Sequence, residues 1–219
     1  MNRKTFHAEL NDLQQLLLTL GERVEIAISK SILSLTNMNR GQAEEVIVKD
    51  VEIDRIEEQI DNMVTKLIAT QQPVAKDLRR IVTAITIASD MERMADLAQN
   101  IAEITVLFVE KDLQLFKPLE DLPRMARISQ EMVHDGINSF IDGNIVLAKQ
   151  MAQKDDEVDQ LYNDIVRELI DYMVKQRELI EPATQLAFVT RHLERIADHA
   201  TNIAESVIYI ETGKREDLN

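Results

Sequence analysis

The sequence contains no cysteine and no tryptophan, and only 4% of its 219 residues are aromatic. The absence of cysteine excludes disulfides, thiolate metal ligands and iron–sulfur clusters, and it suits a cytoplasmic protein. Glycine and proline are also scarce, with five and four residues. So few turn residues require long elements, and long elements with a 45% hydrophobic, mainly aliphatic composition indicate an all-α protein.

Basic residues are fewer than acidic ones: the sequence has 25 Lys and Arg and 39 Asp and Glu, which gives a net charge of −14. This charge argues against nucleic-acid binding, and against capture of free phosphate without a metal. The sequence has no run of 18 apolar residues and no apolar signal region near its start. We therefore expect a cytoplasmic chain that reaches a membrane only peripherally, through partners.

A long internal repeat is the most informative feature present. Residues 90–103 read DMERMADLAQNIAE and residues 192–205 read HLERIADHATNIAE, and nine of these fourteen aligned positions are identical. The offset between the two copies is 102 residues. A repeat maintained only for packing would preserve its apolar positions and let its polar positions drift. Here the oxygen-bearing side chains are identical too, which points to a site.

At about 100° per residue, each copy has an apolar stripe and an oxygen-rich face on nearly the opposite side of the helix. The oxygen-bearing residues of this face are Glu92, Asp96, Asn100 and Glu103 in the first copy and Glu194, Asp198, Asn202 and Glu205 in the second. Like charges four residues apart destabilise a helix by a few tenths of a kcal/mol per pair. We expect this face to point outward and to be compensated by a bound cation.

Periodicity predicts six helices, over residues 5–36, 42–71, 75–110, 121–141, 145–177 and 183–212. Pro73 and Pro182 are expected to interrupt the chain between helices. Short connections make neighbouring helices antiparallel, so each half is predicted to be a three-helix bundle. The predicted units are residues 1–114 and 118–213, followed by a frayed tail at 214–219.

The second helix predicted in each half contains a further repeated pair of acidic residues. Asp50 and Asp54 match Asp155 and Asp159 at an offset of 105 residues. Each of these pairs flanks the apolar stripe of its helix, so it is expected to meet the acids of the following helix along the groove between them. Hard oxygen ligands without Cys or a repeated His select Mg, Ca, Mn or oxygen-bound iron, and several carboxylates together favour a multinuclear cluster.

Each acidic pair taken alone is more often a solvated helix face than a ligand, and only the repetition favours ligation. His199 is expected to be structural, and His192, which matches Asp90, is a weak extra ligand candidate. A ferritin-like di-iron site needs two Glu-x-x-His motifs, and the sequence has a single one at Glu131 and His134. No glycine-rich phosphate loop and no nucleophile elbow is present.

Two tandem repeats, each with Asp-x3-Asp on one helix and a string such as ERIADHATNIAE at residues 194–205 on the next, resemble the PhoU family over essentially the whole chain. The resemblance implies a multinuclear metal cluster, iron before Mn, Mg, Ca or Zn, and a homodimer. The metal ligands that it implies are Asp50, Asp54, Glu92, Asp96, Asp155, Asp159, Glu194 and Asp198, with Asn100, Glu103, Asn202 and Glu205 as secondary ligands. The mismatch between Asp90 and His192 implies clusters that differ in size or metal.

The same resemblance implies a non-enzymatic cytoplasmic regulator of high-affinity phosphate uptake and phosphate-starvation signalling. Its expected partners are the ATPase subunit of the phosphate ABC transporter and a phosphate-sensing histidine kinase. The alternatives are a carboxylate-bridged metal hydrolase or redox enzyme, or a metal store. An enzyme needs an open metal position, usually with a base and an enclosing pocket, and the sequence indicates neither a base nor a pocket.

Overall fold

The computed structural model describes residues 3–218, so Met1, Asn2 and Asn219 lie outside it. It is all-α, as predicted, with no strand among the described residues. Its elements are α1 (Arg3–Thr36), α2 (Arg40–Gln71), α3 (Ala75–Glu110), α4 (Asp121–Asp142), α5 (Ile145–Ala152), α6 (Asp155–Lys175), the 3₁₀ helix η1 (Arg177–Leu179) and α7 (Ile180–Thr212). Within residues 3–218, no helix is both long and apolar enough to span a membrane.

The first turn of each half is built in the same way. Asn39 caps α2 by accepting a hydrogen bond from Gln42 N at 3.1 Å, and Asn144 caps α5 by accepting one from Leu147 N at 3.1 Å. The residue before each cap has a positive φ, 50° at Met38 and 64° at Gly143. A left-handed residue followed by an Asn cap ends one helix and starts the next within three residues. The repeat therefore extends to its turns.

The prediction of one continuous helix over residues 145–177 was wrong. The structure divides it into α5 and α6, with a turn at Gln153 and Lys154. Three acids, Asp155, Asp156 and Glu157, form the first turn of α6, where negative charge is stabilised by the helix dipole. The corresponding part of the first half, α2, continues unbroken. The two halves therefore differ at the position of their first acidic pair.

Pro182 was also predicted to interrupt the chain, and it does not. The chain leaves α6 at the extended residue Gln176, passes through η1, and enters α7 at Ile180. Pro182 lies in the first turn of α7, where its missing N–H has no helical partner to lose. The last helix consequently begins three residues before the predicted start at residue 183.

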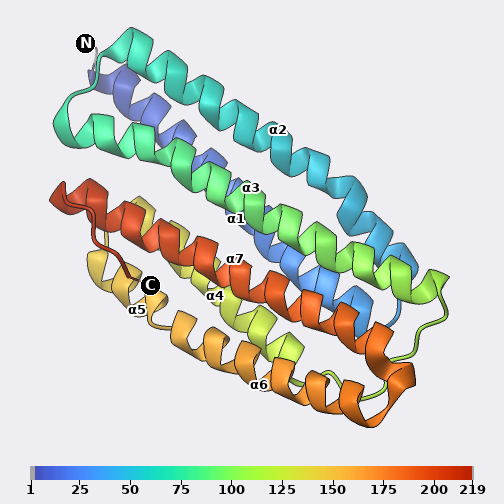
Figure 1. The fold of residues 1–219 in the computed structure, drawn as a ribbon. Helices are drawn as coiled ribbons and strands as arrows, with labels where there is room; N and C mark the ends of the chain where they lie inside the picture. The colour runs from blue at the N-terminus through green and yellow to red at the C-terminus, as the bar shows by residue number, and fades with distance from the viewer. Residues whose placement is uncertain (1–2, 219) are drawn as a thin grey trace.

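The helices α3 and α7 form the centre of the molecule. Figure 1 shows them side by side and antiparallel, with α1 and α2 around α3 and with α4, α5 and α6 around α7. Their register is marked at the two ends by the ion pairs Lys76–Glu211 at 2.5 Å and Lys111–Glu181 at 2.6 Å. One cluster of buried aliphatic side chains runs through both halves. The halves therefore share a core.

Contacts other than the aliphatic core also join the halves. Arg79 donates from Nε and Nη2 to the carbonyl oxygen of Ile210 near the end of α7, at 3.2 and 3.1 Å. Arg80 Nη2 donates to the carbonyl oxygens of Phe140 and Ile141 near the end of α4, at 2.9 and 2.5 Å. The first turns of α3 thus supply donors to helix ends of the other half, where carbonyls lack intrahelical partners.

Residues 214–218, which belong to the tail predicted to be frayed, contact two helices. Residues 214–218 form no helix, but they fold back from Gly213, whose φ is 74°. Lys149 of α5 pairs with Glu216 at 2.8 Å, and Leu218 N donates to Glu205 Oε1 of α7 at 2.9 Å. An ion pair and a charge-assisted hydrogen bond thus attach this segment to two helices.

Candidate functional site

The first acidic group lies in the groove between α2 and α3. It consists of Asp50 and Asp54 from α2 and Glu92 and Asp96 from α3, as the sequence predicts. Burial, and then the charges of Asp54, Asp96 and Glu92 in that order, together raise the pKa of Asp50 to about 6. These four carboxyl groups are therefore close enough to repel one another. We call them the first acidic groove.

The pKa values of the neighbouring acids in this groove are raised as well. Partial burial, and then the negative charges of neighbouring acids, raise the pKa of Glu92 and of Asp96. The pKa of Glu57, one turn further along α2, is raised by burial and by Asp61. Asp61 Oδ1 is itself buried without a hydrogen-bond partner. The groove thus holds more negative charge than its basic neighbours compensate.

The second acidic group repeats this arrangement between α6 and α7. It consists of Asp155 and Asp159 from α6 and Glu194 and Asp198 from α7. Burial, and then repulsion from Asp159, Asp198 and Glu194, together raise the pKa of Asp155 to about 7. Burial and repulsion from Asp198 also raise the pKa values of Asp159 and Glu194. We call these four residues the second acidic groove.

Two carboxylate oxygens of the second acidic groove, Asp155 Oδ1 and Glu194 Oε2, are buried and accept no hydrogen bond. Glu194 is only 9% exposed, which corrects the expectation that its face of the helix points outward. The helix α7 is packed by α3 on one side and by α4, α5 and α6 on others, so little of its surface is free. A buried oxygen without a donor is a natural cation ligand.

Beside the second acidic groove is a hollow of about 290 Å³. Asp155, Asp156, Asp159 and Asp198 line it together with residues of α5 and the tail residue Leu218. A hollow of this size accommodates a hydrated cation together with the movement of its carboxylate ligands. The second acidic groove therefore has both the donors and the space.

Three of the four predicted secondary ligands form hydrogen bonds outside these groups. Asn202 Nδ2 donates to Asp90 Oδ1 on α3 at 3.2 Å, and Glu205 accepts from the tail. Glu103 is exposed and accepts from Gln99 Nε2 at 3.2 Å, and Asn100 is half-buried. The predicted oxygen-rich face of α7 is therefore not one site. Glu194 and Asp198 lie toward α6, and Asn202 lies toward α3.

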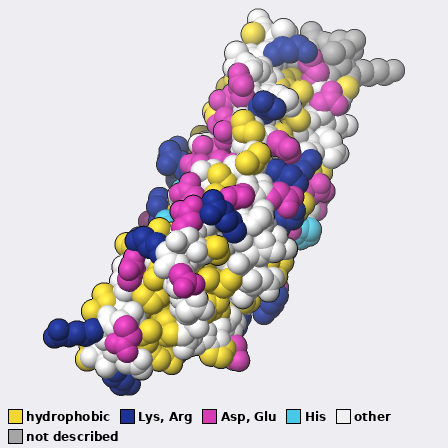
Figure 2. Space-filling view, turned by 90° about the vertical axis from the view of Figure 1, so that its right-hand side faces the viewer, with side chains coloured by type: hydrophobic (Ala, Val, Ile, Leu, Met, Phe, Trp, Pro, Cys, Tyr) yellow, Lys and Arg dark blue, Asp and Glu magenta, His cyan; other side chains and the backbone are white. Residues whose placement is uncertain are grey.

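The acidic grooves fit a hard cation in donor chemistry, because carboxylate oxygens face one another and some lack any partner. Among the described residues, no three His, Asp or Glu side chains already converge to the spacing of a bound metal ion. Ligation therefore requires side-chain rotation, which exposed Asp54, Asp96 and Asp159 can make. Figure 2 shows acidic side chains interspersed with Lys and Arg on one face of the molecule.

One basic residue of the second acidic groove was missed by the sequence reasoning. Arg191 donates to Glu194 Oε1, lies over the ring of Tyr162, and lowers the pKa of Asp159 through its charge. Its spacing three residues before Glu194 is the signal that indicates this contact. Arg191 therefore competes with a cation for one ligand of the second acidic groove.

A mostly buried polar contact between the halves was missed as well. His199 Nδ1 lies 3.0 Å from Asp90 Oδ1, and Asp90 is only 8% exposed. Asn202 donates to the same oxygen of Asp90, so α7 contributes two partners to one carboxylate of α3. The structural role expected for His199 is thus specific, because it joins the central helices.

We expect Asp90 and His199 to be energetically coupled by about 1 kcal/mol, because a hydrogen bond to a charged group is strong when both groups are mostly buried. Urea unfolding at pH 6.5 of the wild type, Asp90→Asn, His199→Leu and the double variant measures this coupling. The pair Glu25–His134 serves as control, because its histidine is 63% exposed and its coupling should be near zero. Additive effects of the Asp90 and His199 substitutions would contradict the prediction.

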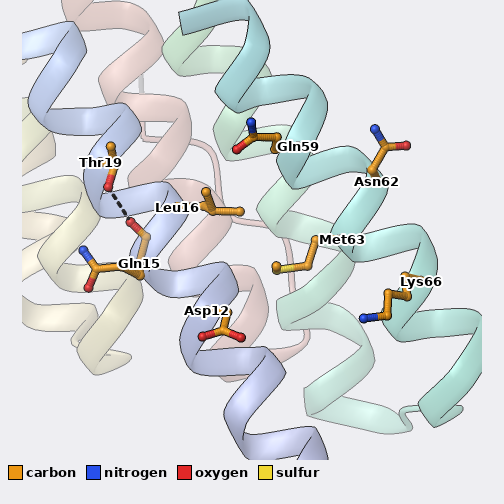
Figure 3. Close-up of a pocket in the computed structure, with 8 residues that line it drawn as sticks. All are labelled: Asp12, Gln15, Leu16, Thr19, Gln59, Asn62, Met63 and Lys66. Carbon is orange, nitrogen blue, oxygen red and sulfur yellow. Dashed lines mark hydrogen bonds between the residues drawn. The ribbon is translucent and has the colours of Figure 1, made fainter. Parts of the chain in front are cut away.

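A larger hollow lies away from both acidic grooves. It occupies about 580 Å³ between α1 and α2 and is lined by Asp12, Gln15, Leu16, Thr19, Gln59, Asn62, Met63 and Lys66. In Figure 3 these side chains lie along two helices, and the hydrogen bond drawn joins Thr19 to the carbonyl oxygen of Gln15. They present mixed polar and apolar groups with a single carboxylate, Asp12, so this hollow is not the candidate site.

Known proteins resemble the chain in sequence. The PhoU domain matches residues 17–105 and again residues 122–207. A relative from Clostridium acetobutylicum, named a phosphate-specific transport system accessory protein PhoU homolog, is 38% identical over the full length of both chains. A relative of the same name from Aquifex aeolicus is 42% identical, covering 94% of this chain and 92% of the relative.

Two solved structures share the fold. The phosphate transport system regulatory protein PhoU from Streptococcus pneumoniae has a TM-score of 0.89 and 35% identity, covering 97% of this chain and 99% of that one. PhoU from Pseudomonas aeruginosa has a TM-score of 0.90 and 32% identity, covering 95% and 100%. The names describe accessory and regulatory proteins, which confirms the prediction of a protein that is not an enzyme. The chain belongs to the PhoU family.

Proposed function

We propose that the chain is a metal-binding accessory protein of phosphate-specific transport that regulates phosphate uptake and phosphate-starvation signalling in the cytoplasm. The names of its relatives support the transport role. The observation that carries the metal proposal is the duplication of a four-carboxylate groove at equivalent places in both halves, each with at least one strongly raised pKa. Acidic residues scattered by chance over the surface would not be expected to form the same group of mutually repelling carboxylates in both halves.

In the proposed protein, Asp50, Asp54, Glu92 and Asp96 hold one cation or cluster, and Asp155, Asp159, Glu194 and Asp198 hold another. A bound cation supplies positive charge that offsets the repulsion among the carboxylates. Carboxylate oxygens favour Mg, Ca, Mn or oxygen-bound iron over Zn, and the resemblance to the PhoU family puts iron first among them. In each groove the ligands come from two helices, so ligation fixes α2 against α3 and α6 against α7.

The proposed partners are the ATPase subunit of the phosphate ABC transporter and a phosphate-sensing histidine kinase, with the chain acting as an adaptor and as a homodimer. Stiffened helix pairs present a defined surface, and metal-free pairs, whose carboxylates repel one another, present a looser one. The metal state thereby becomes a variable that changes affinity for a partner, in the range of 5- to 150-fold that is usual for coupled sites.

The test compares metal-free protein, prepared with a chelator, with protein loaded with Mn²⁺ or Fe³⁺. Loading should raise Tm by about 5–10 °C for each site filled, because ligand at 100 times its Kd adds about 2.7 kcal/mol to the free energy of unfolding per site. Binding to the ATPase subunit and to the kinase is then measured in both states. Equal binding in the two states would leave the metal without a role in partner recognition.

The variant for this test replaces Asp50, Asp54, Asp155 and Asp159 with asparagine, and its Tm should not respond to metal. The matched control replaces Asp164 and Asp171 with asparagine, because these acids lie exposed on α6 outside the second acidic groove. The control should respond as the wild type does. An unchanged metal response in the variant that lacks the four groove acids would reject the proposed ligands.

A further inference from the structure

The two acidic grooves differ in what lies beside them. At Lys111, which corresponds to Gly213 at the repeat offset, the first half continues into the connection 111–120, where Lys117 pairs with Glu168 of α6. That connection leads toward the other half. In the second half, by contrast, the chain turns at Gly213 and comes back along α7. A chain segment therefore lies against the second acidic groove, and the first half has no counterpart.

Contacts of different kinds hold residues 213–218, which we call the strap. Arg215 lies over the ring of Tyr209, at 5.7 Å from its centroid. Glu216 pairs with Lys149 of α5 at 2.8 Å. Leu218 is half-buried against the core and its N–H donates to Glu205 at 2.9 Å. The strap is thus anchored along its length.

The strap ends at the proposed metal site itself. Leu218 lines the same hollow of about 290 Å³ as Asp155, Asp159 and Asp198. Arg215 and Glu216 line a second hollow of about 380 Å³ at the α3–α7 contact, together with Asp90, Asn202 and Glu205. An apolar side chain beside carboxylates obstructs the approach of a hydrated cation, and the Leu218 N–H occupies an oxygen of Glu205.

We propose that the strap restricts cation binding at the second acidic groove, so that the two metal sites of the chain are inequivalent and loading of the second site is coupled to release of residues 213–218. This inference rests on the proposed function, because the cation is its ligand. Coupling is reciprocal: a strap that weakens the cation must itself be loosened by the cation. Metal at the first acidic groove leaves the strap in place.

The experiment titrates Mn²⁺ into two backgrounds that isolate the sites. Asp50→Asn with Asp54→Asn leaves only the second acidic groove, and Asp155→Asn with Asp159→Asn leaves only the first. In each background, the full chain is compared with a chain ending at Gly213. This deletion removes Lys214, Arg215, Glu216 and Asp217, two side chains of each sign, so the net side-chain charge of the protein is unchanged.

Removing the strap should tighten Mn²⁺ binding at the second acidic groove about tenfold, within the usual range of coupling between sites, and change binding at the first by less than twofold. Leu218→Pro, which keeps the strap but removes its N–H, should give part of this gain and guards against misfolding of the shortened chain. Hydrogen exchange of the amides in residues 214–218 should accelerate when Mn²⁺ is added to the full chain.

Equal Mn²⁺ affinity of the full and shortened chains at the second acidic groove would overturn the strap proposal and leave the metal function standing. Tighter binding at both grooves would also overturn it, because the effect would then be unspecific. Absence of Mn²⁺ binding in both backgrounds would overturn the proposed metal function, and the strap proposal with it. Unchanged amide exchange on Mn²⁺ addition would contradict the coupling.

Discussion

Replacing Asp50 and Asp155 with asparagine is expected to stabilise the metal-free protein at pH 8 by about 2 kcal/mol and to have little effect at pH 4. Each carboxyl has its pKa raised, to about 6 for Asp50 and about 7 for Asp155, from 3.8. The folded state therefore binds these protons more tightly than the unfolded state, and stability falls as pH rises from about 4 to above 7. Both groups are half-buried, so they keep some contact with solvent, and its screening keeps the gain modest.

Urea unfolding in the presence of a chelator, at pH 4 and at pH 8, measures this difference. Asp164→Asn is the control, because Asp164 is exposed on α6 and only weakly paired with Arg167 at 4.0 Å. That variant should change stability by less than 0.5 kcal/mol at either pH, as is usual for surface substitutions. A double variant that loses stability at pH 8 would show that these carboxylates are compensated in the metal-free chain.

Replacing Gly21 with leucine is expected to lower the free energy of unfolding by about 2 kcal/mol. Gly21 lies where α1 crosses α4, and a Cβ there would overlap Ile137 Cδ1 and lie 3.3 Å from Ile137 Cγ1. Ile137 is buried, so it has little room to move. Overpacking a core costs about 1–3 kcal/mol, and the better helix propensity of leucine returns at most about 1 kcal/mol. A larger side chain at this crossing also separates the two halves.

Gly41 provides the matched control, because it too is helical but a Cβ there would meet only Asn39 Oδ1, at 3.5 Å. Gly41→Leu should leave stability unchanged or raise it slightly. Adding Ile137→Ala to Gly21→Leu should recover part of the loss, since it removes the overlapping atoms. If Gly21→Leu and Gly41→Leu gave equal stabilities in urea, the close approach of α1 and α4 would not be limiting.

Most helix boundaries followed from local patterns in the sequence. Apolar periodicity and the turn residues near Asn39 and Asn144 predict where helices begin, because capping acts over three residues. The break before Asp155 was missed because the apolar pattern continues through it. Pro182 was misjudged because proline is tolerated in a first turn as well as between helices.

The acidic grooves were predictable because repetition and helical spacing place Asp50 beside Asp96 and Asp155 beside Asp198. The contacts of Asn202 and Glu205 were not, because Asn202 contacts a helix that is distant in sequence and Glu205 contacts the strap, whose fold back along α7 no helical spacing predicts. Likewise, no local rule gives the antiparallel register that brings Asp90 to His199. Such contacts are set by how whole helices pack.

Where α3 and α7 pack together, two copies of one sequence lie antiparallel within a single chain. The isologous interface of a homodimer has the same arrangement, but between two chains. A symmetric homodimer uses every interface residue twice, so a substitution that is favourable on one side is always present on the other side too. Tandem duplication removes that constraint. Asp90 and His199 pair near the middle of the α3–α7 contact, and their counterparts in the repeat are His192 and Leu97. The fused chain has thereby specialised its two halves independently, which separate identical subunits cannot do.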